Sequence, residues 1–446
     1  MFAGSLRSFR RVQGQQIHRL WFAPLAVAIV LWVVGCSDKD SPGPTGPPDP
    51  REGFGLVALG EVPYPPDNPP VLERVELGRL LFFDPILSGA KDVSCGHCHH
   101  PAFAWGDGSP RAIGVTGEVP GIGPSGVGPD RILTDSITHL ETPRNSPSCM
   151  NAGCSAHPQG APDHRGSQFW DGRADGLEGQ AALPITSFDE MAGNVYSAAD
   201  AMDSVLVRLQ EIPGYVSLFR DAFPDEAAEM DQHPERHVIR ESTYDRALGA
   251  YERELIFGSS PYDQYVKGDD DALGDRGFAG LMLFFGEAGC GQCHHGPMLS
   301  SYEFVVSGVD SAGPGRNPVS RGGDGMDWGR WEHTGDDLDR FAFRVPTLRN
   351  IELTAPYLHT GEAATLEDVI RFYNDGGNDY GLEEWRIDSR LKPLGLSEEE
   401  IGDLVAFLRT LTDYTVDSVL IDLTVPANVP SGLTPPEILE PFSRVP

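Results

Sequence analysis

The sequence predicts a mainly α-helical protein with long irregular loops and little strand, and three observations support this class. Apolar residues recur at helical spacing in several stretches, whereas the alternation typical of β-strands is rare. Glycine, proline and aspartate concentrate in residues 105–135 and 305–340, which favours long loops. A helical stretch that ends in two phenylalanines and runs into a cysteine pair occurs twice. The predicted helices are 71–87, 198–212, 237–257, 271–285, 365–373 and 397–412.

The first 35 residues read as an export signal, because four arginines and no acid accompany the apolar run Trp21–Val34. That run is too short to be assigned confidently as a membrane span. It ends in "VVGC", which resembles a bacterial lipobox, so we expect Cys36 to carry lipid and residues 36–69 to form a flexible tether. The alternative is an uncleaved anchor with a buried cysteine. Both alternatives place the bulk of the chain outside the cytoplasm, in a bacterial periplasm.

The chain is strongly acidic, with a formal net charge of −32. Such a surface repels nucleic acid and anionic lipid headgroups, so we expect no nucleic-acid partner and membrane contact only through the lipid on Cys36. The same charge would tolerate or steer a basic protein partner.

Two short motifs, "SCGHCHHPAF" at 94–103 and "GCGQCHHGPM" at 289–298, share the pattern Cys-x-x-Cys-His. A thiol-redox pair would need a thioredoxin-like βαβ pattern, which the sequence lacks. A four-cysteine zinc site would leave the histidine after each pair unexplained. Cys-x-x-Cys-His is the attachment signature of c-type haem, in which the thiols bind covalently and the histidine binds the iron. We therefore expect two covalent haem c groups. The thiols would come from Cys95, Cys98, Cys290 and Cys293, and the iron ligands would be His99 and His294.

Two further cysteines, Cys149 and Cys154, lie outside the motifs. In an oxidising compartment this pair favours a disulfide that closes a small loop, and two free buried thiols are the alternative.

The repeated plan of helix, short turn and motif indicates an internal duplication of a cytochrome-c-like unit. We therefore expect two cytochrome-c-like haem domains, at residues 70–260 and 261–425, followed by a tail at 426–446. Ser397, with acids directly after it, is predicted to cap the last helix.

Longer motifs carry a family resemblance. In order, they are "LGRLLFFDPILS", "CGHCHHPAFAWGDG", "RNSPS", "QFWDGRADGLEGQA", "CGQCHHG" and "FRVPTLRNIELTAPYLHTGEAATLEDVIRFYNDGG". This series resembles the bacterial dihaem cytochrome c peroxidases and MauG-type enzymes over residues 70–412. The resemblance implies that the N-terminal haem is the peroxide site and that the C-terminal haem stores electrons.

The resemblance also implies catalytic residues in the fourth of these motifs. Cleavage of hydrogen peroxide needs a group that moves a proton between its oxygens and polar contacts that hold it. We assign the acid–base role to Glu178, where a carboxylate beside Phe169 and Trp170 would have a raised proton affinity, and the distal amide to Gln168. The alternative is that Glu178 is a surface acid in the first turn of the helix and that Asp171 or Arg173 pairs structurally.

By the same resemblance, the sixth ligand of the C-terminal haem is a methionine in the peroxidases and a tyrosine in MauG. The matching residue here is Tyr373. Met298 and Met326 follow the second motif, but neither lies in that helix. A phenolate stabilises ferric iron and would lower the potential of this haem. The alternative is that Tyr373 is an interfacial aromatic residue on an amphipathic helix.

A calcium ion between the two haem domains is a further family feature. The matching positions are Thr354 and Pro356, through their backbone carbonyls, and Asn145, through its side chain. Oxygen ligands of this kind suit a hard cation.

The sequence departs from the family pattern in two places. Residues 146–168 carry no tryptophan or tyrosine where the family often has an aromatic relay between the haems, so we expect Trp170, Trp105 or direct transfer to serve instead. His139 is the only histidine near the position of a loop histidine that closes the resting peroxide site in many relatives, and a plain surface histidine is an equal alternative.

Three functions are compatible with these residues. The first, which we favour, is a peroxidase that reduces hydrogen peroxide to water with electrons from a small periplasmic cytochrome c or cupredoxin. The second is a MauG-like oxidase that uses peroxide to modify a protein partner, which Tyr373 favours. The third is a non-catalytic dihaem carrier, which Glu178 and Gln168 disfavour. The sequence is also compatible with a homodimer.

Because both motifs are complete, we expect the purified protein to keep two haems per chain through denaturation and acid–acetone extraction. Thioether bonds survive both treatments, and haem absorbance in the protein and organic phases measures the outcome. Haem in the organic phase, or zinc in its place, would contradict the assignment.

Overall fold

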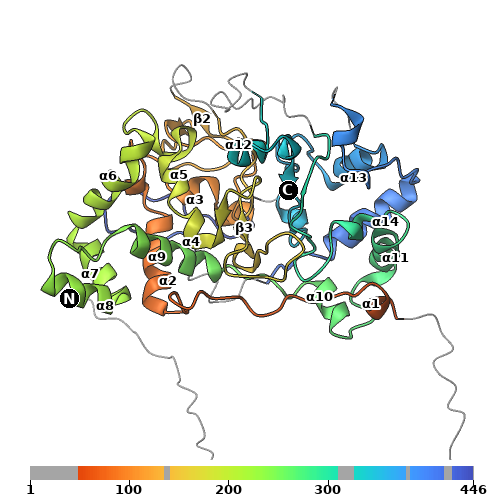
Figure 1. The fold of residues 1–446 in the computed structure, drawn as a ribbon, viewed down its shortest axis with the longest axis horizontal. Coiled ribbons are helices and arrows are strands. Elements are labelled where there is room, and N and C mark those ends of the chain that lie inside the picture. The colour runs from red at the N-terminus through yellow and green to blue at the C-terminus, as the bar shows by residue number, and fades with distance from the viewer. Residues whose placement is uncertain (1–48, 135–140, 310–325, 378–381, 416–423, 445–446) are drawn as a thin grey trace, which may run out of the picture. The chain divides into compact units, whose positions relative to one another are not determined.

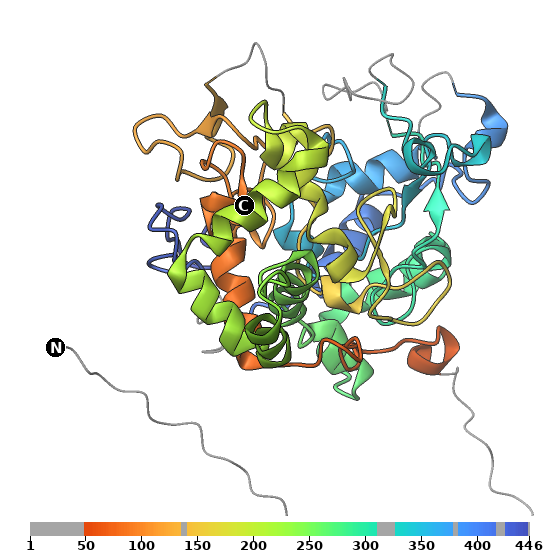
Figure 2. The same ribbon diagram turned by 60° about the vertical axis from the view of Figure 1, so that its left-hand side comes forward.

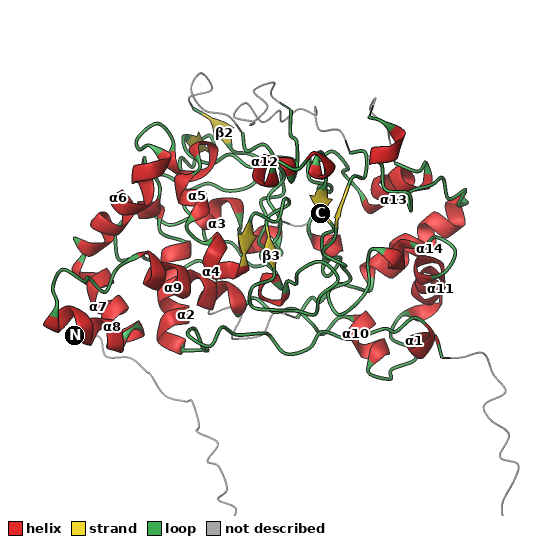
Figure 3. Cartoon of the chain, viewed as in Figure 1, coloured by secondary structure: helices red, strands yellow, loops and turns green. Residues whose placement is uncertain are grey.

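The computed structural model describes residues 49–134, 141–309, 326–377, 382–415 and 424–444. These residues are mainly helical, as expected, with long loops between the helices (Figures 1 and 3). Within the described ranges the strands form three short antiparallel pairs. The pairs are β1 (Gly117–Glu118) with β2 (Ile132–Leu133), β3 (Ser167–Gln168) with β4 (Ala174–Asp175), and β5 (Phe304–Val305) with β6 (Phe343–Arg344).

The helices of the first half surround α2 (Leu72–Phe82), which packs against α9 (Glu241–Arg253). Their apolar faces join a large buried cluster drawn from residues 75–257, to which Leu353 and Val425 also belong. The other α-helices of this half are α3 (Cys95–Cys98), α4 (Gly176–Gln180), α5 (Leu183–Thr186), α6 (Ala198–Gln210), α7 (Pro213–Ala222) and α8 (Pro224–Gln232). Its short turns are η1 (Pro85–Leu87), η2 (Pro101–Phe103), η3 (Ala152–Cys154) and the π-helical turn η4 (Phe188–Ala192).

The helices of the second half centre on α11 (Gly274–Phe285), which packs against α14 (Glu398–Arg409). A second buried cluster, drawn from residues 262–411 together with Leu56, forms around this pair. Ser397 caps α14 by accepting a hydrogen bond from the Glu400 backbone, as predicted. The remaining helices are α10 (Pro261–Val266), α12 (Trp331–Thr334) and α13 (Leu366–Asn374), with η5 (Cys290–Gln292), η6 (Asp337–Asp339), η7 (Ile351–Leu353) and η8 (Glu384–Arg386).

The α2–α9 pair and the α11–α14 pair share one packing feature, a glycine at the contact between the two helices. Gly78 of α2 and Gly280 of α11 each stand four residues before a Phe-Phe pair. A Cβ atom at Gly78 would overlap the Ala247 carbonyl of α9, and one at Gly280 would overlap the Asp403 carbonyl of α14. Each glycine therefore lets two helix backbones approach closely, directly before a cysteine motif. The division into two haem domains at residue 260 stays a prediction.

The expected tether is wrong for its described part, because residues 49–69 pack against the rest of the chain. α1 (Pro50–Gly53) begins this segment, and the backbone N–H of Leu59 donates to the Asp263 carboxylate at 3.1 Å. Further along, the Tyr64 hydroxyl donates to Glu254 at 2.9 Å. Residues 49–69 therefore do not form a flexible tether. The signal and Cys36 lie outside the described residues.

The favoured disulfide is also wrong, because Cys149 and Cys154 are both free and buried. Cys149 belongs to the first large cluster, whereas Cys154 packs in a separate small cluster with Met298 and Tyr302. Burial raises the pKa of both thiols, to about 11 for Cys154, so they stay protonated at neutral pH.

Among the helices that the structure describes, we find none with the length and apolar content needed to cross a bilayer.

We expect Gly78→Ala and Gly280→Ala each to destabilise the protein, because the added methyl group would push apart two packed helix backbones. Overpacking of this kind typically costs about 1–3 kcal/mol in the free energy of unfolding, which urea denaturation measures. Gly179→Ala is the matched control, since its Cβ would meet nothing within 4 Å. Equal stability of all three variants would contradict the role of the two glycines.

Candidate active site

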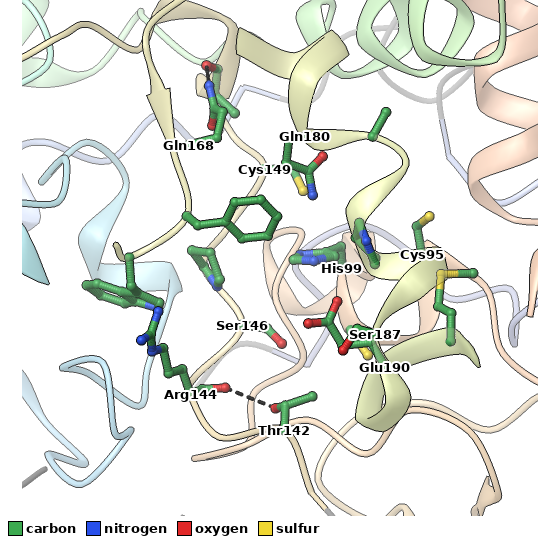
Figure 4. A pocket seen from close by; sticks show the side chains of 18 of the residues that line it. Cys95, His99, Thr142, Arg144, Ser146, Cys149, Gln168, Gln180, Ser187 and Glu190 are labelled. Atoms are coloured by element: carbon green, nitrogen blue, oxygen red, sulfur yellow. Dashed lines mark hydrogen bonds between the residues drawn. The ribbon is translucent and has the colours of Figure 1, made fainter. Parts of the chain in front are cut away.

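The first cysteine motif lies on the wall of a cavity of about 430 Å³. Its wall is assembled from the motif, loop 142–149, residues 168–173, the segment from α4 to η4, and helix α9 (Figure 4). Cys95, Cys98 and His99 reach this cavity together, as the sequence predicts. α12 of the second half adds Glu332 and His333 to the same wall. Segments far apart in the sequence therefore build one site.

His99 is oriented by the turn that follows the motif. Its Nδ1–H donates to the Trp105 carbonyl at 3.2 Å, which favours the tautomer whose Nε2 lone pair can bind a metal. Burial lowers the pKa of His99, so the imidazole is neutral, as a metal ligand must be. The side chain is thus prepared to bind iron from one side of the cavity.

The second motif repeats this arrangement in a cavity of about 300 Å³. Cys290, Cys293 and His294 line it, and the Nδ1–H of His294 donates to the Leu299 carbonyl at 3.0 Å. Burial lowers the pKa of His294 to about 4. Each cavity therefore offers two thiols and one neutral imidazole with its second nitrogen held by the backbone. This donor set fits a haem that is attached through both thiols.

Tyr373 lines the second cavity together with His294. It comes from α13, whose first turn is fixed by a capping box between Thr365 and Asp368. Burial raises the pKa of the Tyr373 phenol to about 12. A metal ion in the cavity would oppose this shift, because a cation stabilises the phenolate.

Glu178 does not belong to the first cavity, so the structure corrects its assignment as the acid–base. Its carboxylate receives two hydrogen bonds from the guanidinium of the fully buried Arg253, at 2.7 and 2.8 Å, and one from the Asn68 amide at 2.7 Å. It also packs against Gly249, where a Cβ would lie 2.9 Å from the carboxyl carbon. Glu178 is therefore a structural ion-pair partner.

Helix geometry explains why Gln180, and not Glu178, lies on the wall of this cavity. Residues two apart on an α-helix point about 200° apart, so Gln180 faces the cavity when Glu178 faces away from it. The predicted amide, Gln168, does lie on the cavity wall, but its amide nitrogen is already used: Nε2 donates to the carbonyls of Ala152 and Gly166, at 3.2 and 3.4 Å. Gln180 is thus better placed to hold a small ligand.

Glu190 is one of several carboxyl groups on the wall of this cavity. It comes from the π-helical turn η4, a rare conformation that is frequent at functional sites. Burial raises its pKa, while the charge of Arg173 and a hydrogen bond from Ser187 oppose the shift. Figure 4 shows Gln180, Glu190 and His99 around the same cavity. A partly desolvated carboxyl group on this cavity wall is suited to accept and return a proton.

A second carboxyl group, Glu252 of α9, also lines this cavity. Burial raises its pKa to about 8, and the charge of Arg253 opposes the shift. At neutral pH Glu252 is therefore mostly protonated and is not suited to act as a base.

Trp170 is one of the two tryptophans expected to serve between the haems. It lines both cavities. Its indole N–H donates to the Asn145 carbonyl at 2.9 Å, and its ring lies 6.3 Å from that of His359. Next to it, Arg144 forms ion pairs with Asp171 and Asp327 at 2.7 and 2.6 Å, which tie the two halves together. Trp105 is fully buried elsewhere in the first half.

Asn145, Thr354 and Pro356, the predicted calcium ligands, all line the second cavity. The Asn145 amide donates to the Ser109 carbonyl at 2.9 Å. In the described part of the chain, no group of three or more His, Cys, Asp or Glu side chains could hold a metal ion. A site built from carbonyls has no such signature, so calcium stays a prediction. His139 lies outside the described residues.

Several known proteins are similar to this chain in sequence and in fold. A family model described as di-haem cytochrome c peroxidase matches residues 72–271. The methylamine utilization protein MauG of Methylorubrum extorquens is 36% identical over 351 residues, which cover 78% of this chain and 81% of that protein. Cytochrome c551 peroxidase of Nitrosomonas europaea is 31% identical over 362 residues, or 80% and 86% of the two chains. A crystal structure of a MauG-like protein associated with microbial copper homeostasis matches with a TM-score of 0.61 and 29% identity. The match covers 80% of this chain and 94% of that one.

These similarities cover most of this chain and most of each relative. The family implies two c-type haems, which agrees with the two sets of thiols and imidazole found here. The chain belongs to the di-haem cytochrome c peroxidase family.

Proposed function

We propose that this protein is a dihaem c-type peroxidase that reduces hydrogen peroxide to water with electrons from a small cytochrome c. The observation that carries the proposal is the first cavity, where Gln180 and Glu190 share a wall with His99 and its two cysteines. Relatives named cytochrome c551 peroxidase support the substrate and the donor.

Each residue of the first cavity would have a distinct role in the reaction. Haem bound there would supply an iron atom that takes up peroxide and passes on electrons. Cys95 and Cys98 would attach the group, and His99 would bind the iron through Nε2. The Gln180 amide would hold the peroxide by hydrogen bonding, and Glu190 would accept a proton from one oxygen and return it to the other.

The second cavity would supply the electrons. Cys290, Cys293 and His294 would hold the second haem, and Trp170, which lines both cavities, would lie on the route between the two haems. The two apolar clusters support two haem domains, at residues 70–260 and 261–425.

A MauG-like oxidase that modifies a protein partner is the second candidate, and Tyr373 is the observation that favours it. Its phenol lines the second cavity. Met298 is buried in another cluster with Cys154 and Tyr302, and Met326 packs beside Trp328 and Phe341. A tyrosine ligand would favour higher oxidation states of this haem. A non-catalytic carrier would have no use for a carboxyl group with a raised pKa on this cavity wall.

We also propose that the protein works in the periplasm, anchored by lipid at Cys36, and that calcium binds near Asn145. The signal-like segment 1–35 and the "VVGC" sequence support the location and the anchor. The joint position of Asn145, Thr354 and Pro356 on one cavity wall supports the calcium site.

We expect Glu190→Gln to lower peroxide turnover by ~10²–10⁴-fold, the usual contribution of general acid–base catalysis. The substitution keeps the size of the side chain and removes its ability to accept a proton. Turnover is measured with reduced cytochrome c as donor, and both haem spectra are recorded to confirm an intact site.

Glu178→Gln is the matched comparison, because Glu178 lies in the same sequence region but pairs with Arg253. We expect this variant to lose stability in urea and to keep turnover within a few-fold of the wild type. The opposite pattern, with turnover lost in Glu178→Gln and kept in Glu190→Gln, would return the role to Glu178.

We expect Tyr373→Phe to raise the reduction potential of the C-terminal haem and to change its ferric spectrum, because a phenolate ligand stabilises ferric iron. Tyr373→Met should raise that potential as well and make the protein behave more like an ordinary peroxidase. Tyr357→Phe is the control, since Tyr357 lines the same cavity. If Tyr373→Phe changes neither spectrum nor potential, Tyr373 only packs, and the MauG-like candidate should be dropped.

A further inference from the structure

The C-terminal segment 424–444 belongs to the first half of the protein, although it follows the last helix of the second half. Val425 is buried in the first apolar cluster, and the Arg79 guanidinium donates to the Thr424 carbonyl at 3.0 Å. The Ser431 hydroxyl donates to the Asp84 carboxylate at 2.7 Å. Figures 1 and 2 show the dark-blue end of the chain beside the orange segment that carries the first motif. The tail is thus an integral part of this half.

Four hydrogen bonds attach this segment to the first half, and three of them reach residues 100–102 of the first motif. The Nδ1 atom of the buried His100 accepts a hydrogen bond from the Ala102 N–H, so its Nε2 carries the proton and donates to the Glu437 carbonyl at 2.9 Å. Further along, the backbone N–H groups of Phe442 and Arg444 donate to the carbonyls of Pro101 and Ala102, each at 3.0 Å. The Glu437 N–H donates to the Ser125 carbonyl at 2.8 Å.

The side chain of Phe442 then reaches the residue that orients His99. Its ring packs edge-on against Trp105, with centroids 6.1 Å apart, and against Phe257 at 5.8 Å. Trp105 is fully buried, and it adopts a φ of 55°, which a residue with a side chain rarely takes and which surrounding contacts must hold. The Trp105 carbonyl accepts the Nδ1–H of His99.

We propose that the segment 424–444 is a clamp that positions the Trp105 carbonyl and so sets the orientation and basicity of His99. A hydrogen bond to Nδ1 makes an imidazole a stronger electron donor to a bound metal. Phe442 is then a positioning residue, which acts on the N-terminal haem through Trp105 and His99. The inference rests on the proposed function in one respect, that His99 binds haem iron.

The second motif provides an internal contrast. Its His294 donates to the Leu299 carbonyl, and Leu299 also has a positive φ, of 49°. That turn is held within its own half: the Ser300 hydroxyl donates to the Val345 carbonyl and the Thr347 hydroxyl to the Met298 carbonyl, each at 2.7 Å. The clamp should therefore influence one haem and leave the other unchanged.

The test uses the full-length protein with both haems, and it measures the two reduction potentials by spectroscopic titration. In Phe442→Ala we expect the potential of the N-terminal haem to shift to more positive values, because a displaced carbonyl leaves His99 a weaker donor. The potential of the C-terminal haem should not move. Phe442→Leu, which keeps most of the apolar volume, should give a smaller shift in the same direction and carries the test if the alanine variant does not fold.

Ile438→Ala is the matched control, because Ile438 lies in the same segment with 60% of its surface exposed. The clamp is refuted if the N-terminal potential of Phe442→Ala and Phe442→Leu equals that of Ile438→Ala, or if both haems shift equally. Failure of the proposed function would look different, since the wild-type protein itself would then lack two haems or would not reduce peroxide.

Discussion

The structure depends on one hydrogen bond that occurs twice, between the Nδ1–H of a motif histidine and a backbone carbonyl a few residues later. This bond decides which ring nitrogen faces the cavity, and without it a neutral imidazole could present either one. The acceptors, Trp105 and Leu299, both have positive φ values, which are unfavourable for residues with side chains. Full burial of both side chains holds these conformations in place. The helices, loops and clusters of each half serve to keep that turn fixed.

The two halves share this frame but differ in other residues of the cavity wall. In the first half these residues include an amide from α4, Gln180, and a carboxyl group from η4, Glu190. In the second half they include the phenol of Tyr373 from α13. An amide with a carboxyl group suits the binding and protonation of a small oxidant, whereas a phenol suits ligation of a metal. One duplicated frame can therefore perform two different tasks.

Glu178 and Glu190 differ in how far neighbouring groups compensate their charge. Glu178 is matched by the guanidinium of Arg253 and the amide of Asn68, so its charge is already stabilised by the protein. Burial raises the pKa of Glu190, and the opposing charge of Arg173 is the smaller effect.

The sequence by itself determined the features that depend on neighbouring residues: the Cys-x-x-Cys-His motifs, the helical periodicities and the Ser397 cap. These could be predicted because their chemistry is complete within a few residues. Only the tertiary structure decided that Glu190 faces the cavity, that Cys149 and Cys154 pack in separate clusters, and that segments 49–69 and 424–444 join the folded body. Each of these depends on contacts between residues far apart in the sequence, and for Glu190 also on a π-helical turn. Local sequence patterns do not encode these long-range contacts or the π-helical turn.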